Sequence, residues 1–171
     1  MNKVLVVTYS HTGTGRKLAR LLCSLKDWEM AEITEERPRG NWRCILDSML
    51  RRRPAIRYDG PNPRHFDMVV LVAPIWAGRL ASPMRSFVAG RRALLPDVAV
   101  VSVMGNTGAP NAVAEIGKLL DRWPILSAAF KTAEIEDGSF AEHVEAFAEA
   151  VQSARGKRSV PKVSEFSPHA A

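Results

Sequence analysis

The chain has 171 residues, of which 46% are hydrophobic and 25% charged, and it carries a formal net charge of +6. This length fits a single domain with a sizeable core, and the composition excludes a disordered or fibrous chain. The apolar run near Met1 is too short for a signal peptide or a membrane span, and no later run approaches ~20 residues, so we expect a cytoplasmic protein.

The first third of the chain predicts two strands and two helices. A continuous apolar run over 4–8 is typical of a strand buried on both faces of a parallel sheet. Leucines at helical spacing predict a helix over 13–25, and a weaker strand follows at 28–33. A short helical pattern over 45–50 ends near Pro54.

The rest of the chain repeats this alternation. The clearest strand covers 67–73, and we expect Pro74 to close it. Ser82 has N-cap chemistry for the next helix, with Pro83 at its first position. The remaining elements are a strand at 98–103, a helix from Pro110, a weak strand at 126–131 and a helix that ends near 153.

Alternating strands and helices predict one α/β domain over 1–153, with five strands and about five helices. Right-handed crossovers return each strand in the same direction, so the sheet is parallel and helices cover both of its faces. Residues 154–171 lack apolar periodicity, and we expect them to form a basic, flexible tail. In such a sheet a ligand binds beyond the carboxyl ends of the strands, where strand order reverses.

The loop over 8–15 leaves the first strand at this edge and opens directly into a helix. It is rich in hydroxyl side chains, and N–H groups at a helix N-terminus bind anions, so the loop predicts a cradle for one phosphate. Taken alone it also fits a capped helix start without a ligand. It lacks the Gly-Lys-Ser/Thr ending of a Walker phosphate-binding loop, and it lacks the Gly-x-Gly-x-x-Gly pattern of dinucleotide-binding loops.

This loop resembles the first loop of the flavodoxin-like proteins, which runs Tyr-Ser-x-Thr-Gly-Asn-Thr. The matching positions are Tyr9, Ser10, Thr12 and Gly13. Thr14 and Gly15 replace the Asn and the last Thr of the family pattern, so one hydroxyl donor is missing or displaced.

The loop over 73–87 is similar to a second flavodoxin-like run, Pro-x-Trp-x-Gly followed by small residues, a proline and an aromatic. Trp76 offers a flat face to an isoalloxazine ring, and Gly78 allows close backbone approach. Packing of Trp76 into the core is the alternative. A third loop over 104–111 carries glycines and polar side chains, like the family loop at the pyrimidine side of the flavin.

The resemblance implies a three-layer fold with a five-stranded parallel sheet of order 2-1-3-4-5, and an FMN cofactor. It implies no catalytic acid or base, and the sequence predicts no metal site or disulfide framework. The expected cofactor-binding residues are Ser10, His11, Thr12, Gly13, Thr14, Gly15, Pro74, Ile75, Trp76, Ala77, Gly78, Met104, Gly105, Asn106 and Gly108.

Positive charge is concentrated between Arg37 and Arg64. This segment contains eight arginines and only two acidic residues, Asp47 and Asp59, which gives a net charge of +6. Such a field favours an anionic partner, although a solvated basic face without a partner is an equal alternative. Nucleic acid is disfavoured because no recognition motif is present.

Two functions follow from these observations. The first is an FMN-binding redox protein, which transfers electrons to a partner protein or uses NAD(P)H to reduce a quinone-like acceptor. The alternative is an interaction module of the same fold, with weak or no flavin binding, that docks an anionic partner through its arginines. The sequence leaves open whether the chain is an enzyme and whether it forms a homodimer.

Overall fold

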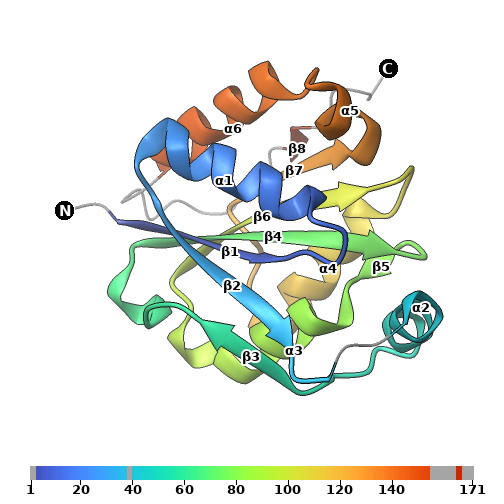
Figure 1. Cartoon of the computed structure of the whole chain (residues 1–171). Helices are drawn as coiled ribbons and strands as arrows, with labels where there is room; N and C mark the ends of the chain where they lie inside the picture. Colours follow the sequence, from blue (N-terminus) through green and yellow to red (C-terminus); the bar gives the residue numbers. More distant parts are fainter. Residues whose placement is uncertain (1–2, 38–39, 155–164, 167–171) are drawn as a thin grey trace.

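The computed structural model describes residues 3–37, 40–154 and 165–166 (Figure 1). The strands are β1 (Val4–Tyr9), β2 (Glu29–Glu35), β3 (Ile56–Asp59), β4 (Met68–Trp76), β5 (Arg79–Leu80), β6 (Asp97–Met104), β7 (Leu126–Lys131) and β8 (Glu165–Phe166). The helices are α1 (Thr14–Lys26), α2 (Asn41–Met49), α3 (Ser82–Arg91), α4 (Ala109–Leu120), α5 (Thr132–Asp137) and α6 (Ala141–Ala154). None of the helices within these residues is long and apolar enough to cross a membrane.

The sheet confirms the predicted strand order. Strands β2, β1, β4, β6 and β7 lie side by side and parallel, which is the order 2-1-3-4-5. The prediction of five strands was too low, because β3 adds an antiparallel edge, β5 folds back on β4, and the two-residue β8 pairs with β7. The three added strands are short and lie at the margins of the sheet, where apolar periodicity is weakest.

Helices cover both faces of the sheet and enclose two apolar clusters (Figure 1). Buried side chains of α1, α5 and α6 pack on one face, and those of α3 and α4 pack on the other. The central strands contribute to both clusters, which explains their uninterrupted apolar runs. The carboxyl ends of β1, β4 and β6 meet at one edge, so the three predicted loops leave the sheet together.

Pro74 does not close its strand, contrary to the prediction. β4 continues to Trp76 and then turns back into β5. The ladder between β1 and β4 ends at Val72, so the missing N–H group of Pro74 is not needed on that side. The Pro74 carbonyl accepts a hydrogen bond from the Ala81 amide at 3.1 Å, which closes the hairpin.

The start of α3 also differs from expectation. Ala81 is the N-cap of α3, and Ser82 is the first helical residue, with its amide 3.2 Å from the Ser48 hydroxyl. The tail expected over 154–171 falls mostly outside the described residues. Within it, Ala154 is the last residue of α6, and Glu165–Phe166 form β8, which pairs with β7.

Candidate functional site

The loop between β1 and α1 presents free backbone amides. Gly13 is the N-cap of α1, with a φ of 96° and no side-chain capping bond. The first helical hydrogen bond runs from the Lys17 amide to the Gly13 carbonyl at 2.9 Å, so the amides of Thr14, Gly15 and Arg16 precede any helical acceptor. A Cβ atom at Gly13 would meet no atom within 4 Å, so the space in front of the loop is open.

Hydroxyl groups surround these amides. The Ser10 hydroxyl accepts a hydrogen bond from the Gly13 amide at 3.0 Å, and the Thr12 and Thr14 hydroxyls lie 3.2 Å apart. The first turn of α1 contains no acidic residue. Amide and hydroxyl donors together with the positive helix end make this loop suited to an anion.

Gly15 is buried in the first turn of α1. A Cβ atom there would lie 3.5 Å from both the Ser10 hydroxyl oxygen and the Tyr9 carbonyl oxygen, which is ordinary van der Waals contact. Gly15 therefore lacks the hydroxyl of the threonine in the flavodoxin-like pattern. No close approach of backbone requires a glycine at this position.

A cavity of about 220 Å³ borders this loop on the β2 side. Its lining is made by Tyr9, Ser10, His11, Arg16, Glu32, Ile33, Thr34 and Glu35. Arg16 forms an ion pair with Glu32, and the Tyr9 hydroxyl donates to Glu35 at 2.5 Å. Sequence reasoning missed the residues from β2, because only the parallel pairing of β1 with β2 brings them beside the loop.

Trp76, at the end of β4, connects the second loop to the first. Its ring is half-buried and lies edge-to-face with the rings of Tyr9 and His11, with centroids 5.7 Å and 5.9 Å away. His11 Nε2 lies 2.7 Å from Asn41 Oδ1, at the start of α2. Trp76 thus packs on the edge of the core and also reaches the predicted phosphate loop.

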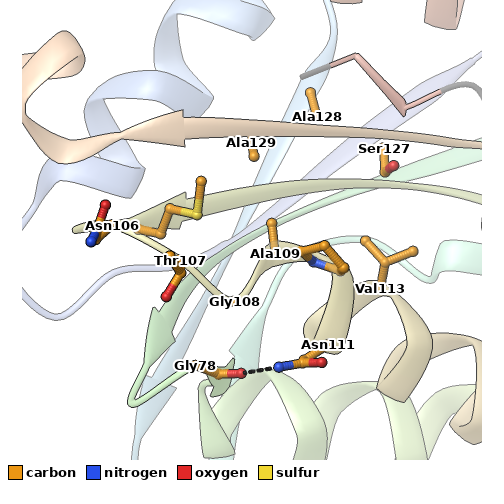
Figure 2. A pocket seen from close by; sticks show the side chains of 12 residues that line it. Gly78, Asn106, Thr107, Gly108, Ala109, Asn111, Val113, Ser127, Ala128 and Ala129 are labelled. Atoms are coloured by element: carbon orange, nitrogen blue, oxygen red, sulfur yellow. Dashed lines mark hydrogen bonds between the residues drawn. The ribbon is translucent and has the colours of Figure 1, made fainter. Parts of the chain in front are cut away.

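The second and third loops touch each other at two glycines. Gly78 and Gly108 both have positive φ values, of 72° and 112°. A Cβ atom on Gly108 would come within 2.5 Å of the Gly78 Cα atom. Asn111 Nδ2 donates to the Gly78 carbonyl at 3.2 Å and fixes the same contact (Figure 2).

A larger cavity, of about 480 Å³, opens on the β7 side of the third loop (Figure 2). It includes four expected residues, which are Gly78, Met104, Asn106 and Gly108. The others are Thr107, Ala109, Pro110, Asn111, Val113, Ser127, Ala128 and Ala129. The three β7 residues are small and carry no motif, so only the adjacency of β6 and β7 identifies them.

The structure therefore brings all three predicted loops to one edge of the sheet. Loops one and two meet through His11 and Trp76, and loops two and three meet through Gly78 and Gly108. Buried Ile75 and half-buried Pro74 lie at the base of the hairpin, whereas the exposed Ala77, Gly105 and Asn106 lie at loop tips. No cluster of three or more metal-ligating side chains occurs among the described residues.

No protein-family model and no curated protein sequence matches the chain. Solved structures do match it. A flavoprotein from Lactobacillus acidophilus, determined in complex with FMN, is 21% identical with a TM-score of 0.66, covering 81% of this chain and 99% of that one. Flavodoxin 2 from Bacillus cereus is 18% identical with a TM-score of 0.59, covering 88% and 98%. A flavone reductase is 13% identical with a TM-score of 0.60, covering 95% of this chain and 66% of its own.

Proposed function

We propose that this chain, whose fold is flavodoxin-like, binds FMN where its three loops meet and acts as a redox protein. The observation that carries the proposal is the contact between the uncapped start of α1 and the Trp76 loop, through the His11 and Trp76 rings 5.9 Å apart. A phosphate site and an aromatic platform in contact match the two ends of one phosphorylated flavin.

The first loop fits the phosphate end. The free amides that begin α1 and the hydroxyls of Ser10, Thr12 and Thr14 would donate to phosphate oxygens. Open space at Gly13 leaves room for the group. The first turn of α1 has no carboxylate to repel a phosphate. Arg16 pairs with Glu32 and the Lys17 ammonium donates to the Ile135 carbonyl at 2.7 Å, so the phosphate donors of this loop are its amides and hydroxyls.

The second and third loops fit the ring end. Trp76 offers an apolar face, while the backbone around Gly78 and Gly105 is accessible because neither glycine has a neighbour within 4 Å of an added Cβ. Bound FMN would supply one- and two-electron redox chemistry at its ring. Backbone N–H groups of these loops would stabilise negative charge at the polar edge of the ring, and Trp76 would exclude water from one face.

Two redox roles are compatible with this site, and one assay separates them. An NAD(P)H-dependent reductase turns over a quinone with NADPH and FMN in the absence of any second protein. An electron carrier is reduced chemically but does not turn over under these conditions. We propose the reductase role, because the net charge of +6 favours an anionic nucleotide as electron donor. If the purified protein is colourless and does not bind added FMN, both roles are overturned.

A further inference from the structure

Helix α2 and its C-cap residue carry most of their large apolar side chains on the outside of the molecule. Four of them form one stripe at helical spacing: Trp42 is 84% exposed, Leu46 51%, Met49 54% and Leu50 55%. The helices of globular proteins normally turn such a stripe toward the core. Contiguous exposed apolar surface of this kind marks an interaction site.

The inner face of α2 is small, polar and firmly attached. Cys44, Asp47 and Ser48 are buried on the side opposite the stripe. The buried guanidinium of Arg85 donates to the Ser48 carbonyl at 3.2 Å and to the Arg52 carbonyl at 3.1 Å. These bonds fix the orientation of α2, so the exposed stripe follows from how the helix is held and not from fraying.

The surface around the stripe is basic. Residues 41–53, which form α2 and the turn after it, contain four arginines and one acidic residue, a net +3. That acid, Asp47, is 4% exposed and pairs with Arg52 at 3.3 Å. The other exposed arginines on α2 and in the turn that follows it are Arg43, Arg51 and Arg53.

We propose that this ridge, defined as Trp42, Leu46, Met49 and Leu50 with the three arginines Arg43, Arg51 and Arg53, docks the protein on an anionic lipid bilayer. An apolar stripe bordered by arginines, with a tryptophan at its start, is the chemistry that inserts into the headgroup region of such a surface. α2 lies at the periphery of the fold, so the ridge can reach a flat surface (Figure 1).

Two other occupants fit the ridge less well. A second copy of the chain, meeting it face to face, would bring the same arginines of both copies together, and like charges oppose such an interface. A stable protein interface takes roughly 20 residues or more on each side, whereas the ridge has seven. A bilayer needs only a shallow apolar anchor and a set of cations.

Docking through α2 would also place the loop edge near the membrane. Asn41, at the start of α2, contacts His11 of the first loop. An acceptor dissolved in the bilayer, such as a lipid-soluble quinone, would then lie close to the proposed flavin. This consequence rests on the proposed function, but the docking itself does not.

The test is sedimentation of the full chain with vesicles of phosphatidylcholine alone or with roughly 30 mol% phosphatidylglycerol. We expect sedimentation with the anionic vesicles only, a blue shift of tryptophan emission on binding, and weaker binding at roughly 0.5 M salt. The double change Trp42→Ser and Leu46→Ser should lower the partition coefficient by about tenfold or more. Trp123→Ser, which removes a tryptophan that is 53% exposed on another surface, should leave it unchanged.

Three results would overturn the proposal. Equal binding of the double variant would assign the effect to other basic residues, such as those after Ala154. Equal binding to neutral vesicles would remove the role of the arginines. Self-association that the double variant abolishes, without vesicle binding, would make the ridge a contact between copies. Circular dichroism shows whether the variants fold, and none of these measurements requires flavin, so a failed flavin titration is a separate outcome.

Discussion

Gly108 lies so close to Gly78 that a Cβ atom on Gly108 would come within 2.5 Å of the Gly78 Cα atom and 2.9 Å of its carbonyl carbon. The two glycines join the hairpin after β4 to the start of α4. Because the neighbouring atoms belong to backbone, they cannot move aside as a flexible side chain would. The geometry of the proposed ring site therefore depends on a glycine at this position.

Gly108→Ala should separate these two loops. The new methyl group would meet the Gly78 backbone, and an L residue at a φ of 112° is strained in addition. We expect the free energy of unfolding to fall by about 2 kcal/mol, measured by urea denaturation. Flavin affinity should fall as well, because the proposed ring site loses its shape.

Gly105→Ala is the matched control for this change. It lies on the same loop, but its added Cβ would meet no atom within 4 Å, and its φ is not positive. We expect its stability to remain within about 0.5 kcal/mol of the wild type. Equal effects of the two substitutions would show that the Gly78 contact is not what holds the loops.

Much of this site could be predicted from the sequence, because strand-loop-helix patterns place three loops at the carboxyl edge of a parallel sheet. Tyr9, Ser10 and Trp76 carry a recognisable spacing, so the approach of the first two loops follows from the fold. The contribution of Glu32 and Ser127 could not be predicted, since neither belongs to a motif. They lie beside the loops only through strand pairing, which a sequence pattern does not state.

The outward orientation of the apolar stripe on α2 could not be predicted from the sequence, for a different reason. The periodicity of Trp42, Leu46 and Met49 shows an apolar stripe but does not show which way it points. The orientation is decided by Arg85, which holds the inner face of the helix through hydrogen bonds to backbone carbonyls. One of them, the Arg52 carbonyl, is 33 residues away in the chain. Tertiary contacts of this range override the usual preference for an inward stripe.

The ion pair between Arg85 and Glu115 should be important for stability. The two side chains are 2% and 13% exposed, and the guanidinium also bonds three backbone carbonyls. Glu115→Ala would leave a buried positive charge without its carboxylate, which should lower the free energy of unfolding by about 3 kcal/mol. Urea denaturation measures this change.

The control for Glu115→Ala is a surface pair. Arg92 and Asp121 are 55% and 84% exposed and lie 3.6 Å apart. Asp121 has a positive φ, so the change is made on the arginine side of the pair. Arg92→Ala should change the free energy of unfolding by less than about 1 kcal/mol. A loss as large as that of Glu115→Ala would contradict the distinction between buried and exposed pairs.

Tyr58 should make stability fall at high pH. Burial raises the pKa of Tyr58 from 10.0 to about 12, although the Arg91 guanidinium, 4.6 Å from the ring centre, opposes the shift. The unfolded chain therefore releases this proton first as the pH rises, so the stabilising contribution is complete below about pH 10 and is lost between about pH 10 and 12.

Urea denaturation at several pH values across this window tests the prediction. Tyr58→Phe removes the titrating hydroxyl and its 2.7 Å hydrogen bond to the Pro61 carbonyl. We expect this variant to be less stable at pH 8 but to lose stability less steeply above pH 10. The same slope in both proteins would mean that Tyr58 does not titrate differently in the folded state.

Gly15→Thr should strengthen phosphate binding. The position has room for a Cβ atom at ordinary contact distance, and threonine would restore the hydroxyl of the family pattern. A hydrogen bond to a charged phosphate is worth about 1.5 kcal/mol, so FMN should bind about tenfold more tightly. Gly15→Ala is the control, because it fills the same space without a hydroxyl and should leave FMN affinity close to that of the wild type.

The most direct test of the proposed function is calorimetric titration of the flavin-free protein with FMN and with riboflavin, side by side. The two ligands share the ring and differ in the phosphate that the loop of Ser10 and Thr12 is proposed to hold. We predict that FMN binds at least about tenfold more tightly, and that the double change Ser10→Ala and Thr12→Ala lowers this preference without weakening riboflavin. Equal affinity for the two flavins, or no binding of either, would contradict the proposal that this loop holds the phosphate of FMN.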